Sequence, residues 1–188
     1  VNRISVFGVP WLLFMVTLLM RWMYAPDQRR YLYAAMLVYG WLATIHQSLI
    51  LSAVGVEVLI LMVQPKLGRD MFAGNALIYL VILFYISKGS VPALNAMTNT
   101  EKFLFNLVGL ASIGVAGWLI VKTGKLFTEF LSLVIMGVMW VAGVSVYFYS
   151  AVSCMTVPPM QWGYPRTVEG FFHMISRGQY GTGEGVNV

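Results

Sequence analysis

The chain has 188 residues, of which 59% are apolar and only 10% are charged. A soluble domain carries about 25% charged residues, so this composition excludes a water-soluble globular protein. The net charge of +5 comes from basic residues that stand singly or in pairs at the ends of apolar blocks, which is unlike a nucleic-acid-binding surface. Cys154 is the only cysteine, which excludes an internal disulfide, and we expect it to be a small buried residue.

Long apolar blocks at the start of the chain predict membrane helices. Residues 4–24 have the length of one crossing, about 20 residues, and the polar run 26–30 follows them. A single helix through residues 31–63 would be about 50 Å long, against a hydrocarbon core of about 30 Å. The one polar run in this stretch lies at 44–48, so we predict a turn there between two arms of about 15 residues each.

Polar clusters separate three further predicted spans. Lys66, Arg69 and Asp70 are interpreted as a loop before the first of them. Polar residues at 87–102 precede the second, and a short charged segment at 122–129 precedes the third. The three spans cover residues 71–86, 103–121 and 130–155.

This order of blocks predicts an all-α, polytopic transmembrane helix bundle of about six hydrophobic helices over residues 1–155. Residues 156–188 are predicted to form an outer-face loop and an interfacial amphipathic helix, as the start of a further segment. The chain begins at Val1, already close to an apolar block, and ends in a glycine-rich tail without a helix end. We therefore expect it to be an internal fragment of a larger protein.

The distribution of Lys and Arg predicts an orientation. The connections at 21–30, 64–70 and 122–129 hold Arg21, Arg29, Arg30, Lys66, Arg69, Lys122 and Lys125. The other side holds Arg3, Lys88, Lys102, Arg166 and Arg177. The positive-inside rule favours a cytoplasmic position for the first group. The turn at 44–48, the loop at 87–102 and the C-terminal tail are then expected on the outer face.

Glu57 is the one acidic residue near the middle of a predicted span. An ionised carboxylate at that depth costs several kcal/mol, so we expect it to face the bundle interior, pair with a cation or be protonated. It is a candidate site residue, and the alternative is a structural hydrogen bond between helices. His46 and Gln47 at the predicted helix break are candidates too, with capping of the turn as the alternative. No second histidine lies at metal-ligand spacing, so no metal site is predicted.

The tail combines a proline-rich segment with an amphipathic helix. Pro158, Pro159 and Pro165 restrict helix formation to the residues after 165. Over 167–176 the apolar stripe consists of Val168, Phe171, Phe172 and Ile175, and the polar stripe of Glu169, His173 and Arg177. Trp162 and Tyr164 are of the type expected at a membrane interface. The polar stripe faces either a site or simply water.

Two parts of the chain resemble a family of large bacterial multi-spanning membrane proteins described as protein O-mannosyltransferase-like. The longer match is PPMQWGYPRTVEGF at 158–171, with RGQY at 177–180. The second match comprises APDQRRYLY at 25–33, Thr44, His46 and Gln47, and LGRD at 67–70. The two matches occur in the family's order and bracket nearly the whole chain.

This resemblance implies a glycosyltransferase-C architecture, in which a helix bundle binds a polyprenyl-phosphate sugar donor. It implies sugar transfer to a protein or glycan acceptor at the outer, periplasmic face of a bacterial inner membrane, without a cofactor. The catalytic carboxylate would lie before Val1, so the catalytic residue itself stays unassigned.

The reaction assigns candidate roles to the tail. Arg166 and Arg177 would stabilise the leaving lipid phosphate, and His173 would assist a proton or phosphate contact. Trp162 or Tyr164 would stack on a sugar or line the lipid path. Two alternatives remain open. One is a transporter or flippase for a lipid or polar solute, suggested by Glu57 and the broken helix, and the other is a non-catalytic membrane scaffold.

Overall fold

The computed structural model describes residues 3–45, 49, 52–89, 99–156 and 165–175, and every structural statement below refers to these residues. They form α-helices, with no strand among them. The expected all-helical class is therefore confirmed. The helices in chain order are α1 (Arg3–Tyr24), α2 (Arg30–Ile45), α3 (Ala53–Val63), α4 (Pro65–Ser87), α6 (Asn99–Thr123), α7 (Phe130–Val144), α8 (Tyr147–Cys154) and α9 (Val168–Ile175).

Helix α4 begins at Pro65, six residues before the predicted start at 71. Proline suits the first turn of a helix because its fixed φ is already helical and its missing N–H has no intrahelical partner there. The interpretation of Lys66, Arg69 and Asp70 as a loop is therefore wrong: they lie in the first two turns of α4. The connection from α3 is reduced to Gln64.

The predicted turn after α2 lies mostly outside the described residues. Thr44 and Ile45 still belong to α2, whereas His46, Gln47 and Ser48 are not described. The last predicted span is interrupted at Ser145 and Val146, where one turn separates α7 from α8. The predicted span over 130–155 is therefore two consecutive helices and not one continuous helix.

Three segments are long and apolar enough to cross a membrane: 65–87, 102–123 and 130–154. They carry large apolar side chains on their exterior, and Leu77, Leu110 and Leu131 are 59%, 61% and 72% exposed. Such surfaces are stable in lipid and support a membrane location. Helix α3, with 11 residues, is about 16 Å long and does not span a bilayer by itself.

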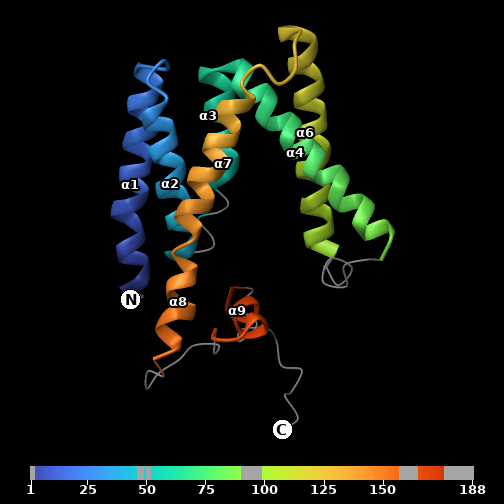
Figure 1. Ribbon diagram of the computed structural model, residues 1–188. Helices are drawn as coiled ribbons and strands as arrows, with labels where there is room; N and C mark the ends of the chain where they lie inside the picture. Colours follow the sequence, from blue (N-terminus) through green and yellow to red (C-terminus); the bar gives the residue numbers. More distant parts are fainter. Residues whose placement is uncertain (1–2, 46–48, 50–51, 90–98, 157–164, 176–188) are drawn as a thin grey trace.

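The helices form two groups that meet at one end (Figure 1). In the first group α2 packs between α1 and α7, and α8 continues the direction of α7. In the second group α4 packs along α6 and leans away from α7. The groups join where α3 turns into α4 and where the α6–α7 loop returns to α7.

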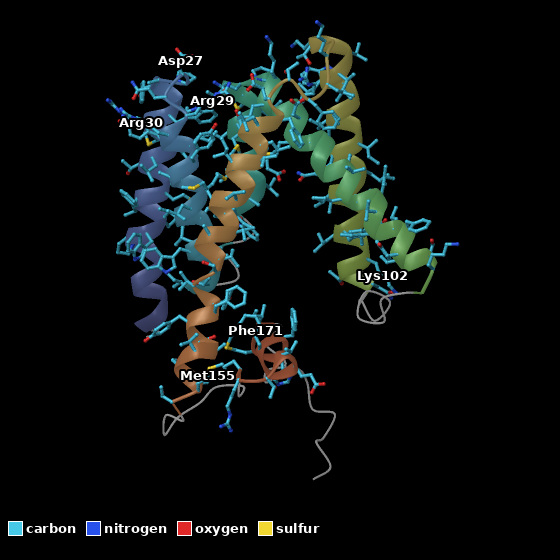
Figure 2. All side chains as sticks on the ribbon, in the orientation of Figure 1. Asp27, Arg29, Arg30, Lys102, Met155 and Phe171 are labelled. Carbon is cyan, nitrogen blue, oxygen red and sulfur yellow. The ribbon has the colours of Figure 1, made fainter. Side chains whose placement is uncertain are left out.

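The α1–α2, α3–α4 and α6–α7 connections lie at this same end of the molecule, as the alternating spans predict (Figure 1). Asp27, Arg29 and Arg30 mark this end in Figure 2, whereas Lys102, Met155 and Phe171 lie toward the other. The end that carries the first three connections is called the basic end from here on.

Close backbone approach holds α2 against α7. A Cβ atom added to Gly40 would collide with the carbonyl oxygen of Trp140, and one added to Gly143 would collide with that of Leu37. The absence of side chains at both positions lets the helices approach to backbone contact, which is a common means of packing helices in membranes. Tyr147 adds a hydrogen bond from its hydroxyl to the Ala43 carbonyl oxygen at 3.2 Å.

We predict that Gly143→Ala lowers the free energy of unfolding by about 1–3 kcal/mol, because the methyl group must displace backbone atoms of α2. Thermal unfolding of the purified chain in detergent measures the effect. Gly137→Ala on the same helix is the matched control, since nothing lies within 4 Å of a Cβ there. Equal melting temperatures for the two variants would contradict the close-approach model.

A buried ion pair joins the start of α4 to the α6–α7 loop. Arg69 and Asp70 are 1% and 0% exposed. The Arg69 guanidinium donates to Asp70 at 2.7 Å, to Thr123 Oγ1 at 2.9 Å and to Thr128 Oγ1 at 2.8 Å. All of its partners except Asp70 belong to the end of α6 or the loop that follows.

The Asp70 carboxylate completes this junction. It accepts hydrogen bonds from the backbone N–H of Phe127 at 3.0 Å and of Glu129 at 2.7 Å. Phe127 has a φ of +57°, a left-handed conformation that costs about 1–3 kcal/mol for a bulky residue. The carboxylate therefore stabilises a loop that would be unfavourable by itself.

We predict that Asp70→Asn lowers the free energy of unfolding by about 3–5 kcal/mol, because the buried Arg69 charge loses its counter-ion. Asp27→Asn, at an exposed position of the same end, is the control and should unfold like the unsubstituted chain. Thermal unfolding in detergent compares the two. A small effect of Asp70→Asn would mean that the junction is not what fixes the loop.

Candidate functional site

The described part of the tail forms a short capped helix. The Thr167 hydroxyl accepts a hydrogen bond from the Gly170 N–H at 3.0 Å, which is the N-capping arrangement that starts α9 at Val168. The predicted helix over 167–176 begins within one residue of α9, and residue 176 lies outside the described part of the chain. Glu169 and His173 are both exposed and are spaced four residues apart, as expected for one polar stripe.

An aromatic stack ties α9 to α8. The rings of Phe148 and Phe171 are parallel within 8°, with centroids 5.4 Å apart. The predicted apolar stripe is only half used in this contact, because Phe171 and Ile175 are partly buried while Val168 and Phe172 are 74% and 63% exposed. The remaining apolar surface suits the membrane interface.

The structure brings only some of the predicted site residues together. Arg166, Glu169 and His173 are exposed on one short segment beside α8. Glu57 lies apart from them, on α3. The other predicted site residues lie outside the described part of the chain: His46, Gln47, Trp162, Tyr164 and Arg177.

Glu57 has a polar partner on the neighbouring helix. Its Oε1 accepts a hydrogen bond from Asn75 Nδ2 at 2.9 Å, which links α3 to α4. Both side chains line a cavity of about 420 Å³ whose other walls come from α4 and α6. Glu57 therefore makes the hydrogen bond between helices that was one of the two alternatives, and its carboxylate also lines a cavity.

A second hydrogen bond that involves a side-chain amide lies beside the same cavity. Tyr79 donates its hydroxyl proton to Asn106 Oδ1 at 2.7 Å, and its ring fits against α6 because Gly109 has no side chain. Sequence reasoning missed Asn75 and Asn106. The sequence did offer a signal, because each asparagine is a single amide side chain within an apolar block. A side-chain amide in lipid requires a hydrogen-bond partner, just as a carboxylate does.

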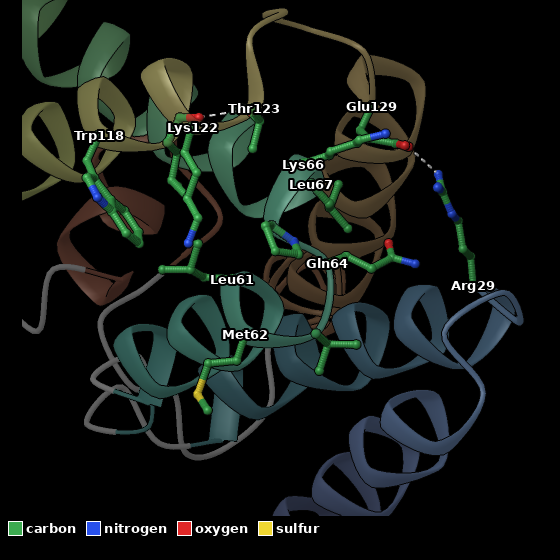
Figure 3. Close-up of a pocket in the computed structure, with 13 residues that line it drawn as sticks. Arg29, Leu61, Met62, Gln64, Lys66, Leu67, Trp118, Lys122, Thr123 and Glu129 are labelled. Carbon is green, nitrogen blue, oxygen red and sulfur yellow. Dashed lines mark hydrogen bonds and ion pairs between the residues drawn. The ribbon is translucent and has the colours of Figure 1, made fainter.

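A larger cavity lies at the basic end (Figure 3). It has a volume of about 770 Å³, within the range of small-molecule sites. Trp118 and Lys122 lie on one side of it, Arg29 and Glu129 on the other, and Gln64 and Leu67 between them. Its lining residues are Arg29, Leu61, Met62, Val63, Gln64, Pro65, Lys66, Leu67, Trp118, Leu119, Lys122, Thr123 and Glu129.

On one wall of this cavity the charges of an arginine and a glutamate neutralise each other. Arg29 and Glu129 form an ion pair at 2.6 Å, and Arg29 also bonds the buried Ser132 hydroxyl. The hydrogen bond and the charge of Glu129 raise the pKa of Arg29, so its guanidinium stays charged. Gln64 donates to the Pro26 carbonyl oxygen at 3.1 Å, while its own Oε1 is buried without a hydrogen-bond partner.

Two lysines of the lining have no ion pair among the described residues: Lys122 lies on the opposite wall, whereas Lys66 lies on the side of Glu129 (Figure 3). Lys122 places its ammonium 5.0 Å from the centre of the Trp118 ring, a cation–π contact. Lys66 is exposed and has no ion pair among the described residues. The sequence showed these lysines only as charges at the ends of apolar blocks, because the start of α4 and the end of α6 become neighbours only in the fold.

No three His, Cys, Asp or Glu side chains come together as a possible metal site in the described ranges. Comparisons with protein-family models, with curated proteins and with solved structures found no match.

We predict that Asn75→Leu destabilises the chain by about 1–3 kcal/mol, because it leaves the Glu57 carboxylate without its hydrogen bond. Replacing both residues, as Glu57→Leu with Asn75→Leu, should recover most of the loss, since no polar group then remains unpaired. Melting temperatures in detergent for the two single variants and the double variant provide the test. A double variant as unstable as the sum of the singles would show that the pair is not coupled.

Proposed function

We propose that this chain is part of a membrane glycosyltransferase, protein O-mannosyltransferase-like, that uses a polyprenyl-phosphate-linked sugar donor. In this proposal the tail lies on the periplasmic face of a bacterial inner membrane and the basic end lies in the cytoplasm. The acceptor is a protein or a glycan.

The arrangement of α9 is the observation that carries the proposal. A capped amphipathic helix is fixed to the end of α8 by the Phe148–Phe171 stack and leaves Glu169 and His173 exposed. Arg166 precedes this helix on the same surface segment. The segment is also the one with the longest resemblance to the transferase family. In this proposal α9 lies at the depth of lipid phosphates, where its polar stripe suits the recognition of a lipid-linked donor.

The reaction sets two demands on the complete site. The bond between the sugar anomeric carbon and the phosphate oxygen breaks, and a bond from that carbon to the acceptor oxygen forms. The acceptor proton passes to a carboxylate base, which the proposal leaves unassigned. The leaving polyprenyl phosphate gains charge, which arginine stabilises well because its planar fork holds two oxygens at once. Arg166 and Arg177 take this role in the proposal, assisted by His173, while Trp162 or Tyr164 contacts the sugar or the lipid.

A transporter or flippase is the second candidate, favoured by one observation. The Glu57–Asn75 pair lines a cavity between α3, α4 and α6, and polar groups at such depth often mark a solute path. Sugar transfer and solute flux distinguish the two functions directly. A non-catalytic scaffold would show neither.

The test is Arg166→Lys in the intact protein, assayed in membranes for transfer of a radiolabelled sugar from polyprenyl-phosphate mannose to a protein acceptor. Loss of the bidentate contact should lower the rate about 10- to 100-fold, the equivalent of about 1.5–3 kcal/mol for a charge-assisted hydrogen bond. The same substitution at Arg177 should act in the same direction.

Arg30→Lys is the matched control, because it makes the same change at an exposed position of the basic end. All variants are checked for normal membrane insertion. A normal transfer rate for both Arg166→Lys and Arg177→Lys would assign these arginines to lipid anchoring and remove the tail from the donor site.

A further inference from the structure

The cavity lies at the basic end, where Arg29 is, whereas Phe171 and α9 lie toward the other end of the molecule (Figure 2). The proposed donor site does not use it. Its lining belongs to the end of α3, the start of α4, the end of α6 and the adjoining loops, so it exists only because these segments meet at the buried Arg69–Asp70 junction.

The lining is amphiphilic. Leu61, Met62, Leu67 and Trp118 supply an apolar wall, and Met62 and Trp118 are 78% and 58% exposed, so this wall continues onto the outer surface of the bundle. A ligand that fits it needs a hydrocarbon portion, because a small hydrophilic ion would leave this apolar surface against water.

The polar part of the lining is cationic. Arg29, Lys66 and Lys122 stand against the single carboxylate of Glu129. Arg29 holds Glu129 at 2.6 Å, so the positive charge that remains belongs to Lys66 and Lys122. A ligand with complementary charge carries an anionic head group.

The position of the cavity along the helices indicates how deep in the membrane its ligand would lie. Lys66 lies at the start of the 65–87 span and Lys122 at the end of the 102–123 span, where phospholipid head groups meet the hydrocarbon core. Trp118, one turn before Lys122, belongs to the residue type that prefers this boundary. Lysine stems can lie along the apolar wall while their ammonium groups reach the phosphate layer.

We propose that this cavity is a binding site for an anionic phospholipid, with its head group attracted by the net positive charge of Lys66 and Lys122 and an acyl chain along Met62 and Trp118. The lipid covers the outer wall of the junction between the two helix groups. It comes from the leaflet at the basic end, where lysines near the surface attract acidic lipids.

The test uses the delipidated chain in non-ionic detergent, titrated with phosphatidylglycerol or phosphatidylcholine and followed by native mass spectrometry. Phosphatidylglycerol should bind more tightly. The double variant Lys66→Gln with Lys122→Gln should lose that preference, by about fivefold for each lysine removed. Both lysines are exposed, so the fold should survive, and thermal unfolding checks that it does.

Lys88→Gln with Lys102→Gln is the matched control, since it removes the same charge at the other end of the α4–α6 pair. It should keep the preference for phosphatidylglycerol. Loss of the preference in both double variants would reduce the effect to general surface charge and overturn the proposal.

A soluble competitor distinguishes the lipid from a free phosphate compound. Millimolar glycerol phosphate should leave phosphatidylglycerol bound, because it cannot occupy the apolar wall. Effective competition by glycerol phosphate would assign the cavity to a soluble anion and overturn the lipid assignment. Neither result depends on the tail, so the outcome is separate from that of the sugar-transfer test.

Discussion

The buried pair of Arg69 and Asp70 is the constraint on which the arrangement of the helices depends. Two unpaired charges at that depth would each cost several kcal/mol, so each must find every partner that it can. Arg69 finds Thr123 and Thr128, and Asp70 finds the backbone of the α6–α7 loop. Since these partners come from the end of α6 and from the loop that leads into α7, satisfying the pair brings the two helix groups together at the basic end.

The sequence was informative where one physical rule acts alone. Block length and charge predicted the helical class, the three apolar segments long enough to cross a membrane and the shared end of three connections. Prediction failed where two rules compete, as at Lys66, Arg69 and Asp70. Charged residues usually mark a loop, but Pro65 starts a helix there, and partners more than 50 residues away satisfy the buried pair. Periodicity carries no information about such distant partners.

The candidate sites also differ in how far local sequence rules could predict them. The capped helix of the tail was predictable, because Thr167, the spacing of Glu169 and His173, and the preceding prolines act locally. The Glu57 carboxylate was visible as an anomaly, whereas its partner Asn75 was overlooked. The cavity at the basic end could not be predicted, because its walls come from segments that become neighbours only when α4 packs along α6.

The contact between Gly40 and Gly143 has a consequence for how the protein is made. Helix α2 leaves the ribosome long before α7, and at about 5–20 residues per second the delay amounts to several seconds. During that interval the glycine face of α2 has no permanent neighbour, and its exposed backbone atoms must be shielded by lipid or by the insertion machinery. The first helix group is therefore completed only after α4 and α6 have been synthesised.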